Sequence, residues 1–430
     1  MIKMRTMISC LSFLLFCLAY VHEAEAKADL QSILEHQEEG ATIYIPAGIY
    51  EGNFTISKEA TIIGDGKVVL KPKNPKEPVL TIAEAKHVYL QNVQINAPGT
   101  GMMIKDSHHV QLSNLSMSSV ESGVEIYQSQ HISIEEISVT GNDRHFANKG
   151  NGIAVFNSSD IFVKNNKIDK VQDGIYIENV QRITVVGNEV ENSRYGTHFM
   201  YSKDAEAYGN QFRKNVTGFM VMMTENVDFS NNAISYQNGF NGTGITLYEV
   251  KNIHIQNHAV SGNRVAISIQ KSTGANITNN RFQMNQTAIE AVQSDTNLVM
   301  KNVFVGNLVN VRSDVKGIQL KENYFDDYSG IDLNDDGIGD ESYAALQSFG
   351  QWMVRKPVYQ YYVESPSVVL LNQIDQQTNK TAKQLLVDET PATNFEKDHA
   401  VHFQLHWPQL VVGWILMIGC IMIWRRSVIV

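Results

Sequence analysis

A 22-residue repeat runs through most of this chain of 430 residues. Each repeat has a short segment of alternating apolar and polar residues, then a Gly or Asn, a second Asn, and an apolar residue two places on. The second of these corner positions recurs every 22 residues, apart from single intervals of 29, 26 and 21, and falls at Val93, Leu115, Ile137, Asn166, Asn188, Asn210, Asn232, His258, Asn280, Asn302 and Asn323. A Gly opens another alternating segment with the same spacing, at Gly101, Gly123, Gly152, Gly174, Gly196, Gly218 and Gly244.

This repeat predicts an all-β fold, a right-handed parallel β-helix of about 11 or more coils. One coil of short strands cannot bury its own apolar face, whereas stacked coils bury a continuous core. Asn suits the corners because it tolerates left-handed backbone angles and can hydrogen-bond to the same residue in the next coil. The β-helix is assigned to residues 27–343, including an amphipathic helix at 28–39 that would cap the open end.

Alternation along the strands after each Gly predicts which side chains leave the core. Positions one and three after the Gly are apolar or small, so positions two and four point outward and align in two columns when coils stack. These columns form the predicted partner-binding face, which comprises Tyr127, Phe156, Tyr176, Glu178, His198, Met200, Met220, Met222 and Tyr248.

An exposed face so rich in aromatic and Met side chains has three interpretations. It could dock a partner protein, with these side chains as anchors. A loop or the C-terminal segment could cover it instead. A copper site made by His198, Met200, Met220 and Met222 is the third interpretation, because thioether ligands select Cu(I), although Met rows more often serve as packing.

The two long intervals arise from insertions at 141–149 and 236–243, at the same corner of coils four apart. We expect them to project on one side of the stack and to form the walls of a docking groove. Further on, a loop places oxygen-bearing side chains at alternate positions with a Gly for the turn, as in a Ca²⁺ loop, at Asp332, Asn334, Asp336 and Asp340. The terminal Glu of such loops is missing, so a turn held by side-chain hydrogen bonds is equally consistent with this pattern.

The first residues resemble a secretory signal peptide, assigned to 1–26. Lys3 and Arg5 precede an apolar stretch, and 24–26 form a small-residue cleavage site. Near the other end, residues 408–426 predict a transmembrane helix, because the apolar run is followed at once by Arg425 and Arg426. A buried core helix is the alternative.

The remaining boundaries follow from these two ends. Positive charge after the predicted span places a tail, 427–430, in the cytoplasm and the rest of the chain outside, anchored to the cell membrane. Residues 344–369 are rich in apolar and aromatic side chains and could cap the far end or dock there. Residues 370–407, rich in Gln, Asn, Thr and charge, are predicted to be a linker.

Charge and cysteine content exclude several classes of function. The chain has 35 Lys and Arg against 45 Asp and Glu, a formal charge of -10, which argues against nucleic acid as a partner. Its 3 cysteines fall in the predicted signal peptide and membrane helix, at Cys10, Cys17 and Cys420. A disulfide framework and a Cys-ligated zinc site are therefore excluded outside the membrane.

Several segments resemble the NosD family of nitrous oxide reductase maturation proteins. They are 46–50 (PAGIY), 173–179 (DGIYIEN), 194–202 (RYGTHFMYS), 323–332 (NYFDDYSGID) and 336–340 (DGIGD). The resemblance implies a non-catalytic accessory protein outside the membrane that works with an ABC-type permease and its cytoplasmic ATPase. Its task would be maturation of the copper–sulfur cluster of nitrous oxide reductase, with the reductase or a copper chaperone as partner. Members of the family are typically free in the periplasm, so the predicted membrane anchor departs from the pattern.

Two other classes of function compete with this one. β-helix lyases and epimerases that act on acidic polysaccharides need clustered exposed carboxylates and a base along one groove. Glu178 beside His198 meets this requirement loosely, without a basic cluster to hold an anionic sugar. A wall-associated adhesin is the other alternative.

Overall fold

The computed structural model describes residues 30–237, 239, 242–315, 317–345, 357–362, 365–378 and 386–394. The predicted signal peptide, transmembrane helix and cytoplasmic tail lie outside these residues. In the part of the chain that is described, no helix is long and apolar enough to cross a membrane.

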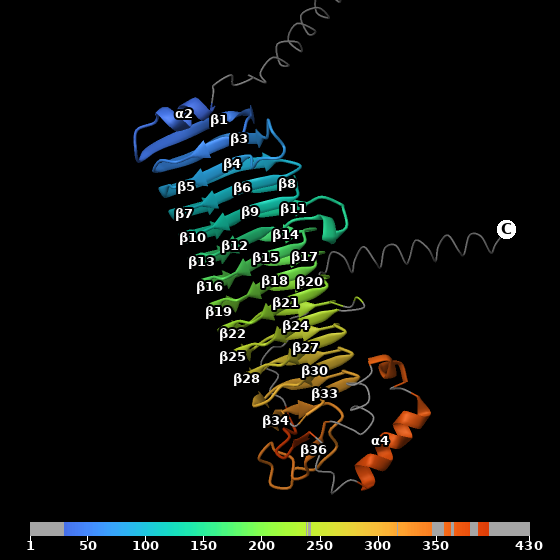
Figure 1. Cartoon of the computed structure of the whole chain (residues 1–430). Coiled ribbons are helices and arrows are strands. Elements are labelled where there is room, and N and C mark those ends of the chain that lie inside the picture. The colour runs from blue at the N-terminus through green and yellow to red at the C-terminus, as the bar shows by residue number, and fades with distance from the viewer. Residues whose placement is uncertain are drawn as a thin grey trace, which may run out of the picture. The chain divides into compact units, whose positions relative to one another are not determined.

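The repeat folds as a stack of turns, each with three strands that pair in parallel with the turns before and after (Figure 1). The register reproduces the 22-residue period: Tyr176 pairs with His198, which pairs with Met220. The prediction of a parallel β-helix is therefore confirmed. Consecutive strands within a turn occupy three faces, which we call face 1, face 2 and face 3.

Face 1 is a sheet of 12 strands. They are β2 (Phe54–Ile56), β4 (Leu80–Ala83), β6 (Thr100–Lys105), β9 (Ser122–Tyr127), β12 (Ile153–Phe156), β15 (Asp173–Glu178), β18 (Tyr195–Met200), β21 (Thr217–Met222), β24 (Thr243–Tyr248), β27 (Val265–Gln270), β30 (Thr287–Val292) and β33 (Val309–Ser313). The repeated glycines stand at the start of the strands from β6 to β24, and the strands from β9 to β24 carry the predicted partner-binding face.

Faces 2 and 3 contain the other two strands of each turn. Face 2 consists of β7 (His108–Ser113), β10 (Gln130–Glu135), β13 (Ser159–Lys164), β16 (Gln181–Val186), β19 (Lys203–Tyr208), β22 (Glu225–Ser230), β25 (Lys251–Gln256), β28 (Thr273–Thr278), β31 (Asn297–Met300) and β34 (Ile318–Lys321). Face 3 consists of β8 (Ser116–Val120), β11 (Ser138–Gly141), β14 (Lys167–Asp169), β17 (Glu189–Glu191), β20 (Gln211–Arg213), β23 (Ala233–Ser235), β26 (Ala259–Ser261), β29 (Arg281–Gln283), β32 (Val303–Val305) and β35 (Tyr324–Phe325). In the first turns β1 (Ala41–Glu51), β3 (Ala60–Lys71) and β5 (Lys86–Asn96) are long, and β5 pairs with both β7 and β8.

The core fills the space between the three faces, and every second residue of a strand contributes a buried side chain to it. Aromatic rings stack within it from different faces, as Phe219 does on Phe229 with ring centroids 4.3 Å apart. The repeated glycine lies where the chain turns into face 1 and leaves no room for a side chain. A Cβ at Gly174 would lie 2.4 Å from Val190 and 2.6 Å from the carbonyl oxygen of Gly196.

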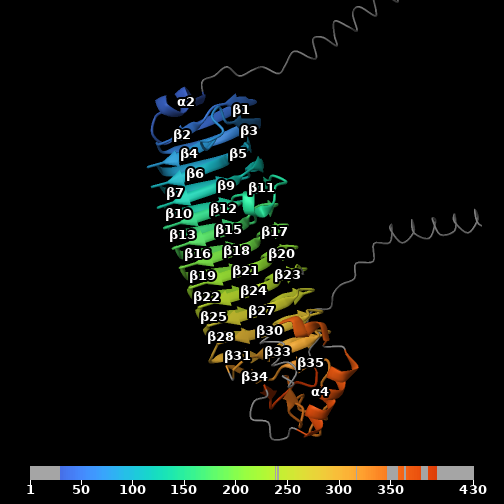
Figure 2. The ribbon, with the colours of Figure 1, turned by 45° about the vertical axis from the view of Figure 1, so that its right-hand side comes forward.

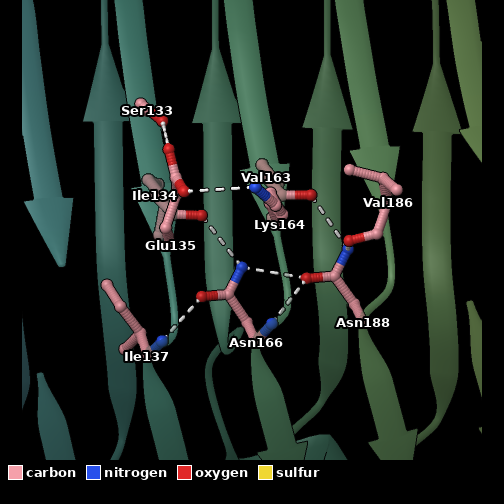
Figure 3. Close-up of polar contacts among 9 residues, drawn as sticks. All are labelled: Ser133, Ile134, Glu135, Ile137, Val163, Lys164, Asn166, Val186 and Asn188. Carbon is pink, nitrogen blue, oxygen red and sulfur yellow. Dashed lines mark hydrogen bonds and ion pairs between the residues drawn. The ribbon is translucent and has the colours of Figure 1, made fainter. Parts of the chain in front are cut away.

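An asparagine ladder closes the corner between faces 2 and 3. The Asn166 side-chain amide donates to Asn188 Oδ1 at 2.9 Å and to the Ile134 carbonyl at 3.1 Å, and its oxygen accepts the backbone N–H of Ile137 (Figure 3). The same pattern continues from Asn188 to Asn210 and on to Asn232. The residue before each ladder position, such as Asn165 or Gly187, adopts the left-handed backbone conformation. The sequence pattern assigned both the left-handed backbone and the hydrogen bond between turns to one corner Asn. In the structure the first corner residue has the left-handed backbone and the second makes the hydrogen bond.

A second ladder, which the repeat pattern did not predict, follows face 3. It passes from Ser193 through Asn215, Gln237 and Asn263 to Asn285, each backbone N–H donating to the next side-chain oxygen at 2.6–2.9 Å. Asn and Gln recur there at intervals of 22 residues, with one interval of 26 that contains the second insertion. The turns are therefore tied to one another by side chains as well as by strand pairing.

The N-terminal end of the stack is covered by α2 (Leu30–His36), as predicted (Figure 1). Leu30 and Leu34 are buried, while Ile33, which the sequence places on the same apolar face, is 41% exposed. Covering this end shields strand edges that would otherwise be free to pair with another chain.

The C-terminal end is closed by a segment that composition assigned to the linker. β37 (Val387–Asp388) pairs in parallel with β34 and antiparallel with β36 (Tyr343–Ala344). Asp388 is fully buried and continues the asparagine ladder, because its carboxylate accepts the Asn323 side-chain amide at 2.9 Å and the Asn323 backbone N–H at 3.0 Å. The described part of 370–407 is therefore not a plain linker. Within 344–378 the structure also forms η2 (Pro357–Tyr362) and α4 (Pro366–Thr378).

The two insertions enter between face 3 and face 1, as expected. The first contains η1 (Phe146–Asn148), and the second precedes β24. Both project along the same edge of face 1 (Figures 1 and 2). The described residues of both insertions leave the stack at this one corner, in agreement with the expectation that the insertions lie on one side. The docking groove that they were expected to wall stays a prediction.

Candidate functional site

The outward side of face 1 gathers the residues that the sequence selected. Along β9 to β24, alternate residues are buried between the faces and the intervening ones are partly exposed, as predicted. We call this surface the docking face; its partly exposed members are Tyr127, Phe156, Tyr176, Glu178, Met200, Met220, Met222 and Tyr248.

Aromatic rings run along the first turns of the docking face. Tyr127 stacks on Phe156 with centroids 4.8 Å apart and an interplanar angle of 7°, and Phe156 packs against Tyr176 at 5.4 Å. The Tyr176 hydroxyl donates to Glu178 at 2.7 Å. Burial and this carboxylate raise the pKa of Tyr176, and burial and Glu125 raise the pKa of Tyr127 to about 12. Both phenols therefore stay neutral and present apolar rings with a polar edge.

His198 departs from the prediction, because it is only 6% exposed. Its Nδ1–H donates to Asp173 at 3.0 Å, and its ring is covered edge-on by Tyr176 and Tyr195 at 5.0 and 5.1 Å. His198 is thus not an exposed anchor of the docking face. His198 is buried because Asp173, at the start of β15, and Tyr195, at the start of β18, pack against its ring.

Asp173 organises this cluster and was not identified as a site residue from the sequence. It is fully buried, and it accepts two hydrogen bonds from the Arg194 guanidinium at 2.8 and 2.7 Å in addition to that from His198. Arg194 in turn lies over the Tyr195 ring at 4.5 Å. A signal was present, since Asp173 stands one residue and Arg194 two residues before a repeated Gly, but only the fold shows that they share one ion pair.

The thioethers lie beside this cluster. Strand pairing places Met220 next to His198 and Met222 next to Met200, at the spacing of about 4.8 Å between neighbouring strands. The Tyr176 hydroxyl contacts Met200 Sδ at 3.7 Å. Nδ1 of His198 is occupied by Asp173, and its Nε2 is buried with no hydrogen-bond partner among the described residues. The candidate copper ligands are therefore neighbours, with one imidazole nitrogen uncommitted.

The Asp-rich loop is arranged by backbone hydrogen bonds. Asp332 accepts the N–H of Gly337 at 2.8 Å, Asp336 that of Ile338 at 2.8 Å, and Asp340 that of Leu333 at 2.7 Å; Asn334 donates to Asp336 at 2.9 Å. This is the arrangement expected for a turn held by its own side chains. Nowhere in the described ranges are three or more His, Cys, Asp or Glu residues grouped to hold a metal ion. The calcium site stays a prediction of the sequence alone.

Models of two families match the chain. The NosD model, described as periplasmic copper-binding protein (NosD), matches residues 135–334. The second model, described as rhamnogalacturonase A/epimerase, pectate lyase-like, matches residues 23–220. The NosD match includes most of the docking face and the first residues of the Asp-rich loop.

A curated relative from Stutzerimonas stutzeri has the name probable ABC transporter binding protein NosD. It is 30% identical over 116 residues, which are 26% of this chain and 27% of the relative. The match thus spans about a quarter of that relative's length.

Solved structures share the fold at low identity. The A-module of the mannuronan C-5 epimerase AlgE6 from Azotobacter vinelandii has a TM-score of 0.54 and 13% identity, over 68% of this chain and 93% of that one. An N-terminal fragment of bacteriophage Phi29 gene product 12 has a TM-score of 0.56 and 11% identity, over 66% of this chain and 61% of that one. An epimerase and a phage protein have this fold in common, so it does not specify an activity. The family model and the curated relative, in contrast, agree with each other and with the sequence motifs: over residues 135–334 this chain is similar to the NosD family.

Proposed function

We propose that this chain is a non-catalytic accessory protein that docks partner proteins on face 1 outside the cytoplasmic membrane. The observation that carries the proposal is the docking face itself, where aromatic and Met side chains of β9 to β24 lie side by side, most of them within the region that the NosD model matches. Partly exposed aromatic and Met residues in one patch are typical of binding surfaces.

We further propose an ABC-type permease and its cytoplasmic ATPase as partners. The name of the curated relative, an ABC transporter binding protein, supports this assignment. Nitrous oxide reductase or a copper chaperone would dock on the same face, and the function would be maturation of the reductase's copper–sulfur cluster. An exported chain anchored by residues 408–426 would stay close to such a permease.

Copper would be cargo in this scheme. The docking face offers one uncommitted imidazole nitrogen, from His198, beside the thioethers of Met200, Met220 and Met222. This donor set suits Cu(I), for which thioether sulfur and imidazole are favourable ligands. The description of the family as copper-binding supports a direct contact.

The test replaces Met200, Met220 and Met222 with Ala in the native host and measures the copper content of nitrous oxide reductase. His198 is kept, because its removal would take one of the hydrogen-bond donors of the buried Asp173 and leave Arg194 as the other. The matched control replaces Met284, which is 66% exposed outside the docking face, and Met300 on face 2. We expect the reductase to lose copper in the triple variant and in a gene deletion, and not in the control. A fully metallated reductase in the deletion strain would reject the proposal.

A second candidate function is a lyase or epimerase that acts on acidic polysaccharide. The pectate lyase-like family model that matches residues 23–220 favours it. The carboxylate of Glu178 would then be essential, so Glu178→Gln should abolish cleavage or epimerisation of polyuronates. Retained copper loading of the reductase together with loss of polyuronate turnover in this variant would favour the enzyme over the maturation factor.

A further inference from the structure

A hollow of about 430 Å³ opens on face 1, where it begins beside the last turns of the docking face and extends to β30. Its wall is formed at the beginnings and middles of β18 to β30, and it includes Arg194, Met220, Thr246, Arg264, Ser268 and Glu290. Met220 belongs to the docking face, but Thr246, Arg264 and Ser268 do not. We call this hollow the Arg264 pocket.

Among the residues that the structure describes, no acidic side chain forms an ion pair with Arg264. Across the described ranges its guanidinium forms no ion pair and no hydrogen bond, and its Nε is buried without a partner. Burial lowers the pKa of Arg264; Glu290 opposes this effect, and Arg312 adds to it. A guanidinium withdrawn from water is unfavourable unless an anion accepts its hydrogen bonds.

The acidic groups nearby are already engaged with other bases. Glu290 forms an ion pair with Arg312, which is only 1% exposed, and Asp173 is held by Arg194 and His198. Even so, Nη1 of Arg312 is buried with no hydrogen-bond partner in the described part of the chain. Among the described residues, this part of face 1 thus has three guanidinium groups and two carboxylates: Arg194, Arg264 and Arg312 against Asp173 and Glu290. It has an excess positive charge, in a chain whose formal charge is -10.

The outward row of face 1 changes its chemistry at this pocket. Strand register continues from Met220 to Thr246, Ser268 and Glu290, so hydroxyl groups replace the aromatic and thioether side chains of earlier turns. Gln270 donates to Ser268 Oγ at 3.0 Å, and the Ser268 hydroxyl hydrogen is then available to another acceptor. A planar guanidinium fork beside hydroxyl donors is the combination that binds carboxylate, sulfate or phosphate groups.

We propose that the Arg264 pocket binds a small oxyanion, a carboxylate or a tetrahedral oxyanion, with Arg264 as the charged donor and Thr246 and Ser268 as hydroxyl donors. The site is independent of the proposed docking function, because these three residues lie outside the docking face. Anion binding can therefore be disproved while the docking function holds, and the docking function can be disproved while anion binding holds.

The test titrates the purified full chain with sodium sulfate, phosphate or malonate, with sodium chloride used to keep the ionic strength constant. Binding is followed by calorimetry and by the rise in unfolding temperature that a native-state ligand produces. We expect saturable binding of at least one of these anions. Preference for sulfate or phosphate would identify a tetrahedral oxyanion as the ligand class, and preference for malonate a carboxylate.

Arg264→Gln should weaken that binding about tenfold or more, since the charged fork is lost. Arg213→Gln is the matched control: it removes the same charge from a surface ion pair with Glu191 on face 3 and should leave affinity unchanged. The double variant Thr246→Val, Ser268→Ala should also bind more weakly, and it serves as the test if Arg264→Gln does not fold. Binding no stronger than that of chloride, or equal affinity in the pocket variants and the control, would overturn the proposal.

Discussion

His258 occupies a ladder position that Asn fills in the turns on either side. Its Nδ1 accepts the backbone N–H of Asn232 at 3.0 Å, and its own backbone N–H donates to Asn280 at 2.9 Å, so it replaces one function of the Asn side chain. Burial lowers its pKa to about 4, although the carbonyls of Asn232 and Phe229 partly oppose this. At His258 the ladder therefore contains a side chain that can take up a proton.

The first prediction is that His258→Asn removes a pH dependence of stability. The native protein takes up a proton at His258 only near pH 4, whereas the unfolded chain does so below about pH 6.5. Lowering the pH through this window therefore favours unfolding, by up to roughly 3 kcal/mol at pH 4. Urea unfolding from pH 7 to pH 4 should show a smaller loss in His258→Asn than in the native chain. The control His254→Asn changes an exposed His on the neighbouring strand, and equal pH dependence in the two variants would contradict the prediction.

At the scale of elements, strand pairing joins neighbouring turns, and the hydrogen bonds of the ladders hold the backbone at the corners. Asn210 accepts the N–H of Asn188 at 2.9 Å and donates to the Val185 carbonyl at 2.9 Å and to Asn232 at 2.9 Å. All of these groups are buried, so nothing else in their turn can satisfy them. The strand pairing of face 3 is short, with three residues in β17, β20 and β23, which makes the corner bonds important.

The second prediction is that Asn210→Ala destabilises the protein by about 2–4 kcal/mol, because several buried polar groups lose their partners. Asn179→Ala is the control: its amide also bonds to an Asn one turn away, Asn157 at 2.7 Å, but the pair is exposed to water. The control should lose about 1 kcal/mol, part of it from the strain of Ala at the left-handed backbone of residue 179. Urea unfolding of both variants measures the difference, and equal losses would show that the ladder is not a source of stability.

At the scale of the molecule, each turn contacts its neighbours, so stability is expected to be local and additive along the stack. The C-terminal end depends on a segment distant in sequence, because Asp388 bonds to Asn323 across 65 residues. The N-terminal end is covered by α2 from the adjacent sequence. The two ends are therefore closed by contacts of very different range.

The third prediction is that Asp388→Ala loosens only the last turns. Removal of its carboxylate leaves the backbone N–H of Asn323 without an acceptor and leaves its side-chain amide with the Val299 carbonyl alone, while the central ladder keeps all of its bonds. Hydrogen exchange should accelerate across 318–325 and remain unchanged across 166–232. Uniform acceleration along the whole chain would mean that the stack unfolds as one unit and would refute the expectation of local stability.

The sequence determined much of the fold because a repeat imposes the same local structure on each turn. The period predicts which residues pair, and alternation within a strand predicts which side chains are buried. The residues of the docking face, from Tyr127 to Tyr248, follow from these two rules with the exception of His198. The same local rules identify the insertions and the corner at which they enter. Each of these inferences needs only residues within one turn and its neighbours.

Other features depended on contacts that no periodicity encodes. Whether His198 is exposed depends on Asp173, Arg194 and Tyr195, which the turns bring together from two strands. In the described ranges Arg264 lacks a bound counter-charge because Glu290 pairs with Arg312. The polar composition of residues 370–407 indicated a linker and gave no sign that Asp388 is buried. A repeat specifies local pairing, but the burial and charge balance of a side chain depend on every group that packs around it, and only the folded chain brings those groups together.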